Sequence, residues 1–185
     1  MLQENLGELI SVYFLQTGIG WAVTGAMFAV MFACIGSAKG IRLGAGQASG
    51  ILSEKPELFG KLFVLMALPG TQGFYGMVAA IMIALRTGLL AGEPAVSPLV
   101  GLALFFIGVT MGIVEWRSAV FQGETSAACI SLTGKRPEEG GRAIVMPGLV
   151  ETYGMVALLV AILMILWLTP EGGLQLGEAA AATGG

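Results

Sequence analysis

The sequence contains no histidine and no aspartate, and only 11% of its 185 residues are charged. The absence of these two residue types excludes the usual histidine-containing zinc centres and any Ser-His-Asp triad. The formal net charge is −3, and nothing in the sequence indicates nucleic-acid binding. We expect no enzyme active site in this chain, because an acid without histidine or a second positioned acid makes a poor catalytic set.

Cysteine and early positive charge are also scarce. The two cysteines, Cys34 and Cys129, stand among alanine, phenylalanine and isoleucine, so we expect small buried side chains rather than a disulfide or metal ligands. No lysine or arginine precedes Lys39, so the positive start of a secretory signal is missing. We therefore expect the first hydrophobic segment to be retained as a membrane span.

Apolar and small residues make up most of the chain. Hydrophobic residues account for 56% of it, the mean hydropathy is +0.85, and 29 residues are glycine. A soluble domain carries about a quarter charged residues, so this composition is typical of a membrane protein. The apolar runs are long and unbroken, whereas a transmembrane barrel needs alternating segments of about 10 residues. The sequence therefore predicts an all-α membrane protein with closely packed helices.

Prolines, glycines and charges divide the chain into four apolar segments. We expect transmembrane helices at about 9–50, 57–90, 99–132 and 141–168. In the first of them Gly36, Gly40 and Gly44 follow one another at four-residue steps. Small residues at this spacing lie on one helix face and allow another backbone to approach closely.

The expected organisation is two tandem helical hairpins. Residues 1–90 form the first hairpin, 91–98 an outer loop, and 99–169 the second hairpin. We expect the tail at 170–185, which is rich in glycine and alanine, to be disordered.

Basic residues concentrate at the two hairpin turns. Only Arg86 lies near the opposite side, besides Arg117 within the third span. By the positive-inside rule, we expect both turns to be cytoplasmic and both termini to lie on the outer side of the cell membrane. The residues that flank the turns are Lys39, Arg42, Lys55, Lys61, Lys135, Arg136 and Arg142.

The second hairpin repeats features of the first. Aligning Pro69 with Pro147 sets Tyr75 under Tyr153. The two aligned stretches are Leu68-Pro69-Gly70-Thr71-Gln72-Gly73-Phe74-Tyr75-Gly76-Met77 and Met146-Pro147-Gly148-Leu149-Val150-Glu151-Thr152-Tyr153-Gly154-Met155. A duplicated two-helix unit is the simplest explanation.

Among the positions at which the two copies differ, one adds a charge: the second copy has Glu151 where the first has Gly73. Glu151 stands inside an apolar run that otherwise reads as a lipid-soluble helix. A charge there costs about 2.5–3.5 kcal/mol on insertion scales, so an acid inside the membrane indicates a functional site.

Several neutral oxygens are expected at the depth of this acid. Counted from Arg136, Gln122 is 14 residues back and Glu151 is 15 residues forward, which places both roughly 21–23 Å from the turn. Thr71 and Gln72 lie 16 and 17 residues beyond Lys55, at a similar depth.

A backbone carbonyl near Pro69 is also available, because proline cannot donate the helical hydrogen bond that would occupy it. Such an oxygen set with one negative charge suits a monovalent hard cation. The alternative is that Thr71, Gln72 and Gln122 only hold the helices together by hydrogen bonds.

On these residues, the sequence resembles the membrane-rotor proteolipid of V-type ATPases in its duplicated four-helix form. The motif around Thr71 and Gln72, paired with Val150-Glu151-Thr152-Tyr153, looks like the sodium-translocating bacterial branch. Gln122-Gly123, with Gln122 29 residues before Glu151, is similar to that branch as well. The resemblance covers about residues 10–168.

The resemblance implies a ring of identical subunits that carries ions as it turns, with the first and third helices inside. Glu151 would carry Na+, with Thr71, Gln72, Gln122 and the Leu68 backbone carbonyl as further ligands, and Tyr75 would donate a hydrogen bond to Glu151. The implied partners are a stator membrane subunit that supplies an arginine, central-stalk subunits at the cytoplasmic turns, and lipid. ATP hydrolysis would take place in another subunit.

Two alternative functions stay open. The same ring could carry H+, for which Glu151 in an apolar setting would suffice. A four-span structural or channel-forming proteolipid without rotary partners would also use closely packed helices.

Three charged residues of the third span need separate explanations: Glu124, which could replace Glu151 as the carrier, and Glu115 and Arg117, which depart from the family pattern. Glu124 is a rival carrier, although two residues beyond Gln122 it is turned about 200° around the helix. Glu115 and Arg117 are not expected from the family; we expect them to pair with each other or a neighbour, or to face a polar lumen. A contact between Arg117 and the site is the other possibility.

Overall fold

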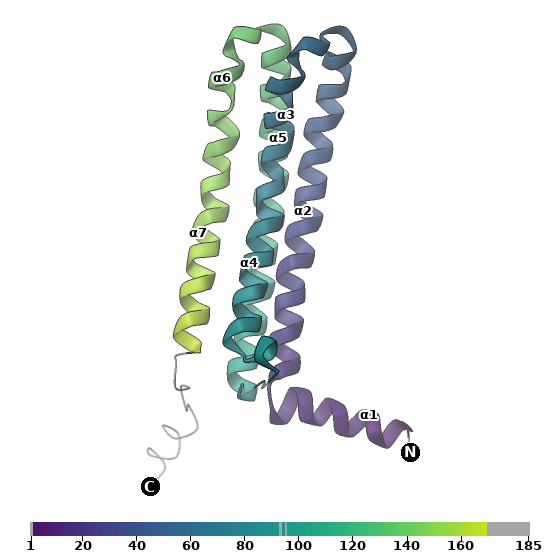
Figure 1. Ribbon diagram of the computed structural model, residues 1–185, viewed down its shortest axis with the longest axis vertical. Coiled ribbons are helices and arrows are strands. Elements are labelled where there is room, and N and C mark those ends of the chain that lie inside the picture. The colour runs from purple at the N-terminus through teal and green to yellow at the C-terminus, as the bar shows by residue number, and fades with distance from the viewer. Residues whose placement is uncertain (1, 93, 95, 170–185) are drawn as a thin grey trace.

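The computed structural model describes residues 2–92, 94 and 96–169. Within this part of the chain, four helical segments are long and apolar enough to cross a membrane. They run side by side, with both hairpin turns at one end of the molecule (Figure 1). The expected all-α fold with two tandem hairpins is confirmed. The four segments are Ile19–Glu54, Pro56–Arg86, Pro98–Lys135 and Pro137–Leu168.

Short breaks divide these spans, and a separate helix precedes them. The α-helices in the described residues are α1 (Leu2–Ile10), α2 (Ile19–Glu54), α3 (Phe59–Ala67), α4 (Thr71–Arg86), α5 (Pro98–Lys135), α6 (Gly140–Ala143) and α7 (Val145–Leu168). A π-helical turn covers Ser11–Gln16, and 3-10 turns cover Pro56–Leu58, Leu68–Gly70, Leu89–Ala91 and Pro137–Glu139. The expected disorder at 170–185 concerns residues outside the described part of the chain.

The start of the first span differs from the expectation of one helix from about residue 9. The π-helical turn after α1 ends at Gln16, and α2 starts at Ile19. Gly18 separates them with a φ of +64°, a left-handed conformation that suits glycine. The hydroxyl of Thr17 donates to the Val12 carbonyl at 3.0 Å and closes the end of the preceding turn. Consequently α1 leaves the bundle sideways (Figure 1).

The second span also ends earlier than expected. Helix α4 stops at Arg86 rather than near residue 90. The Thr87 hydroxyl donates to the Ile83 carbonyl at 2.9 Å, and Gly88 then adopts a φ of +71°. This local geometry ends the helix before the loop to α5. The Arg86 side chain donates to the Thr169 hydroxyl at 3.1 Å, which ties the end of α4 to the end of the fourth span.

The two hairpin turns have the same local geometry. Lys55 and Arg136, which directly precede prolines, have φ/ψ of −133°/69° and −134°/83°. A residue before proline is disfavoured in the α region, so α2 and α5 end there. Each proline then starts a 3-10 turn. This equivalence agrees with the duplication read from the sequence.

The first turn is tied to the second by lysine side chains. The Lys55 ammonium donates to the Gly134 carbonyl at 2.6 Å, and the Lys61 ammonium donates to the Pro137 carbonyl at 2.9 Å. Cations near the carbonyls that end a helix are favourable for the helix dipole. The two turns are therefore joined at one end of the molecule.

Helices α2 and α5 pack backbone to backbone. A Cβ added to Gly25 or Gly36 would lie 2.5 Å from the Cα of Phe105 or Trp116 of α5. Gly40 is equally close to Ala119, whereas Gly44 faces Met66 of α3 instead. The close approach expected at Gly36 and Gly40 is therefore confirmed.

The remaining helices are placed around this pair. Helix α4 packs against α2, and α7 packs mainly against α5. Much of the surface of α7 is exposed, including Leu149, Tyr153 and Trp167. Exposed apolar side chains of this kind suit contact with lipid or with other copies of the chain.

One expectation about the cysteines is wrong. Cys129 is buried, but Cys34 is exposed. The Cys34 sulfur lies on the side of α2 near Gly73 of α4; a Cβ on Gly73 would lie 3.8 Å from it. The sequence could not show which of the two cysteines is buried, because the lipid-facing and the helix-facing sides of a membrane helix are both apolar.

The α2–α5 contact generates a first prediction. Replacing Gly108 with alanine should lower the thermal unfolding midpoint, because the new Cβ would meet the backbone of Gly25 and push the two helices apart. Such overpacking costs about 1–3 kcal/mol. Gly50→Ala is the matched control, since no atom lies within 4 Å of the Cβ it would add. An equal midpoint for both variants would contradict this description of the packing.

Candidate functional site

Glu151 lies in α7, about midway along the fourth span, Pro137–Leu168. It follows Pro147 by one helical turn, and its side chain is only 9% exposed. On its helix it therefore faces the other helices rather than the surrounding medium. A carboxylate in such a position needs hydrogen bonds or a cation to offset its desolvation.

Two side chains from other helices donate to this carboxylate. The Tyr75 hydroxyl of α4 donates to Glu151 Oε1 at 2.7 Å. The Gln122 amide of α5 donates to Glu151 Oε2 at 3.4 Å and to the Pro147 carbonyl at 3.0 Å. Three spans thus meet at one carboxylate. The counts of residues from the turns placed Gln122 at this depth, and the contact with Tyr75 is the one that the family resemblance implied.

Gln72 extends the network from α4 to α5. Its amide nitrogen donates to Gln122 Oε1 at 2.7 Å and to Ser118 Oγ at 3.3 Å. Both glutamines are fully buried, at 0% exposure. Two buried amides can be tolerated here because each has partners.

Thr71 and Leu68 complete the polar layer at the proline of the second span. The Thr71 hydroxyl donates to the Leu68 carbonyl at 3.0 Å and to Gln72 Oε1 at 3.3 Å. The 3-10 turn Leu68–Gly70, which contains Pro69, places this carbonyl beside the start of α4. All the residues expected from the sequence to form the site therefore belong to one connected set.

Apolar clusters enclose this layer on both sides. Toward the hairpin turns lies a core that includes Leu62, Leu65 and Ile130. Toward the opposite end lie a small cluster around Ala29 and Ala79, and another around Leu104. The polar layer thus lies between apolar regions, and its two glutamines are fully buried, which strengthens the electrostatic interactions in it.

The rival acid does not belong to this layer. Glu124 is exposed, on another face of α5 from Gln122. Arg117 is also exposed, and its guanidinium lies over the ring of Phe121, 4.6 Å from the centroid. The expected pairing of Glu115 with Arg117 is wrong, because residues two apart on a helix point in different directions.

Glu115 is instead fully buried on the side of α5 that faces α7. In the described part of the chain, neither of its carboxylate oxygens has a hydrogen-bond partner. Sequence reasoning missed its position, as it missed Ser118. Glu115 lies seven residues before Gln122, and Ser118 lies four residues before it. Residues at these spacings share one helix face, so this pattern could have placed both on the side of α5 that carries Gln122.

The ligands that this layer could offer to an ion are oxygen atoms, which do not suit a transition-metal centre. No group of three or more histidine, cysteine or acidic residues that could hold a metal ion occurs among the described residues. The available oxygen atoms are those of one carboxylate, two amides, the hydroxyls of Thr71, Ser118 and Tyr75, and backbone carbonyls. The chemistry this set supports is reversible binding of a small hard cation or a proton.

Comparison with known proteins agrees with the duplication. The family model for the C subunit of ATP synthase matches twice, at residues 24–83 and at residues 105–164. Each match covers most of one hairpin, and the two together exceed half of the chain.

Three relatives are similar over most of the chain. V-type sodium ATPase subunit K of Enterococcus hirae is 32% identical over 149 residues, covering 80% of this chain and 92% of the relative. A-type ATP synthase subunit K of Methanocaldococcus jannaschii is 30% identical over 161 residues, covering 87% and 70%. The 16 kDa proteolipid of the V-type proton ATPase of Nephrops norvegicus is 26% identical over 144 residues, covering 78% and 89%.

The doubled match, the two tandem hairpins and these relatives lead to one conclusion: the chain is a multi-pass membrane protein that belongs to the family of the ATP synthase C subunit.

Proposed function

We propose that this chain is the ion-carrying subunit of the membrane rotor ring in a rotary V- or A-type ATPase, and that it carries Na+ on Glu151. The observation on which the proposal depends is the buried carboxylate of Glu151, which meets Tyr75 and Gln122 from two other spans. A carboxylate at this depth is costly unless a bound cation or proton neutralises it. Reversible neutralisation is what an ion carrier requires.

Sodium is favoured over a proton by the neutral oxygens around Glu151. A proton needs only the carboxylate, whereas a sodium ion needs several further oxygens. Gln72, Gln122, Thr71 and the Leu68 carbonyl supply them, and the terminal torsion of a glutamine is broad enough for either amide to turn its oxygen toward a cation. The relative from Enterococcus hirae, which is named as a sodium ATPase subunit, also supports this cargo.

The same physics explains how rotation could be coupled to transport. With its ion bound, Glu151 is neutral and can pass the hydrocarbon; ionised, it cannot do so cheaply. Unloading therefore requires a compensating positive charge, which we assign to an arginine of a stator membrane subunit. Moving one charge against 100 mV costs about 2.3 kcal/mol, within the reach of ATP hydrolysis in other subunits.

The packing of the helices supports an assembly of identical copies. The tight pair α2 and α5 suits the inner layer of a ring, and α4 and α7 suit the outer layer that faces lipid and the stator. The basic hairpin turns are proposed to be cytoplasmic, where they would contact central-stalk subunits. Both termini would then lie on the outer side of the cell membrane.

The sodium shell gives one prediction. In Gln122→Met rings, sodium should protect Glu151 from carbodiimide at least tenfold less well, because the variant keeps the volume but removes the amide oxygen. Loss of one interaction with a charged group costs about 1.5–3 kcal/mol, which corresponds to a roughly 10–100-fold weaker affinity for sodium. Labelling of the Glu151 peptide is measured by mass spectrometry at rising sodium concentrations.

Gln47→Met is the control, since Gln47 is exposed near the hairpin turns. If sodium fails to protect the unaltered chain at neutral pH, the ring carries protons instead.

The Tyr75 hydroxyl gives a second prediction. Tyr75→Phe should raise the sodium concentration for half-maximal ATPase activity by roughly tenfold or more, because the hydrogen bond to Glu151 at 2.7 Å is lost. Tyr153→Phe should leave it unchanged, since Tyr153 is 74% exposed on α7. Equal effects of both substitutions would refute a role for Tyr75 in holding the carboxylate.

Exchange of the acid itself separates a rotary carrier from a structural or channel-forming proteolipid. Glu151→Gln should leave ring assembly intact, because the amide has the same shape, but abolish sodium-coupled ATPase activity. Glu124→Gln, which removes an exposed acid of α5, should preserve both. Unchanged ion pumping by the Glu151→Gln ring would favour the structural alternative.

A further inference from the structure

Glu115 is a second carboxylate inside the membrane span that the proposed ion path does not use. Of the acids in the described part of the chain, only Glu115 and Glu151 are buried, and Glu115 is 0% exposed. Glu151 receives two hydrogen bonds, whereas neither oxygen of Glu115 has a partner among the described residues. A buried polar group without any partner requires an explanation.

The side chain of Glu115 points from α5 to the backbone of α7 at Gly154. Its Oε2 lies 2.8 Å from the position that a Cβ on Gly154 would take, and Ser118 Oγ lies 3.3 Å from that position. Gly154 is almost one turn beyond Glu151 along α7. Glu115 therefore lies next to the polar layer, on its side away from the hairpin turns.

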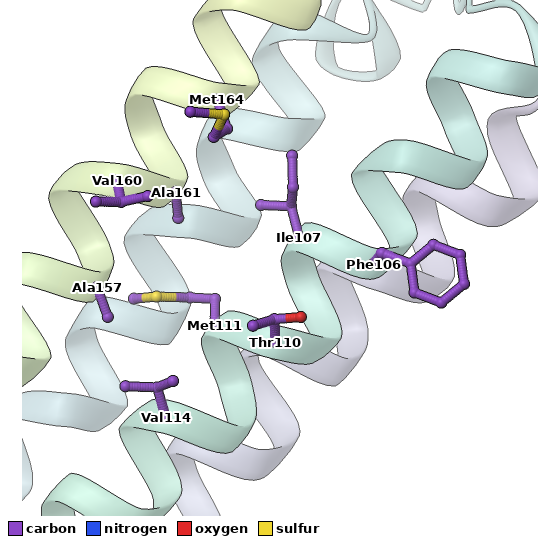
Figure 2. A pocket seen from close by; sticks show the side chains of 9 residues that line it. All are labelled: Phe106, Ile107, Thr110, Met111, Val114, Ala157, Val160, Ala161 and Met164. Carbon is purple, nitrogen blue, oxygen red and sulfur yellow. The ribbon is translucent and has the colours of Figure 1, made fainter.

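Beyond Glu115 the interface between α5 and α7 becomes apolar. An open groove of about 440 Å³ begins there, and the side chains lining it come from both helices (Figure 2). Met111 and Val114 from α5 and Ala157 and Ala161 from α7 line it, and Thr110 is its one polar lining residue. The surroundings on this side cannot solvate a charge.

No positive group in the described residues balances Glu115. The nearest arginine in the sequence, Arg117, is exposed and lies over Phe121. The titratable groups that act electrostatically on Glu115 or are affected by it are Glu151 of α7 and Tyr75 of α4. An ionised Glu115 would therefore add a second negative charge near Glu151, and the two would repel each other.

A neighbouring copy of the chain cannot supply the missing partner directly, because Glu115 is buried within a single chain. A second metal ion also fits poorly. Ser118 Oγ lies near the same point of α7, but it accepts from Gln72, and no hydrogen bond joins it to Glu115. Metal ions take several oxygen ligands, whereas a proton needs one.

We propose that Glu115 is a proton-binding site, distinct from the cargo site, whose carboxyl group keeps a proton taken up from water while Glu151 exchanges its ion. With Glu115 neutral, the polar layer holds one negative charge, and one monovalent cation on Glu151 neutralises it. This proposal does not depend on whether the cargo is sodium or a proton.

Infrared difference spectroscopy of assembled rings in lipid tests the proposal at neutral pH with saturating sodium. The unaltered ring should show the carbonyl stretch of a protonated carboxylic acid, displaced in D2O. Glu115→Gln should lose this band, apart from any share that a proton on Glu151 contributes, and Glu124→Gln, the control on the same helix, should keep it. If Glu115→Gln removes the bands of an ionised carboxylate instead, the proposal is overturned.

The Glu151→Gln ring provides a second reading in case Glu115→Gln does not assemble. It lacks the cargo carboxyl, so a protonated-acid band that persists in it supports Glu115 as the proton-bearing group. Absence of the band in this ring would overturn the proposal. Failure of sodium protection at Glu151 would refute only the sodium cargo, and would leave the Glu115 band as predicted.

Discussion

The desolvation of one carboxylate is the constraint on which the rest of this structure depends. Glu151 is buried within a chain whose spans are mostly apolar, and its charged form is stable only if nearby groups compensate for the lost water. Tyr75, Gln122 and Gln72 provide a fixed polar layer for this purpose. Because the layer is enclosed by apolar clusters, the binding of one cation has a large electrostatic effect there.

The scaffold keeps this layer in place through close helix packing. Glycines let α2 and α5 touch along their backbones, and this pair supports α4 and α7, which bring Tyr75 and Glu151 together. The duplication is functionally asymmetric. Where the second half has Glu151, the first half has Gly73, whose backbone N–H donates to Ser37 Oγ at 2.8 Å. The second half thus supplies the acid and Gln122, and the first half supplies Tyr75, Gln72 and Thr71.

Most of the fold, and the grouping of polar side chains around Glu151, could be predicted from the sequence, because both depend on simple regularities. Hydrophobic runs and prolines define the spans, and equal distances from the hairpin turns put Gln122 and Glu151 at one depth. The break at Gly18 could not be predicted, since a single glycine in a helical run does not reveal a left-handed backbone, and the close approach of Gly18 to Ser97 is a tertiary contact. The positions of Glu115 and Arg117 also depend on the rotation of α5, which α2 and α7 determine together.

Direct binding of radioactive sodium to the purified ring tests the central claim most closely. The account predicts saturable binding of one sodium ion per chain at neutral pH, competition by protons as the pH falls, and loss of binding when Glu151 is replaced by glutamine. A ring that assembles normally but shows no saturable sodium binding at any pH would contradict the assignment of Glu151 and its oxygen neighbours as a sodium site.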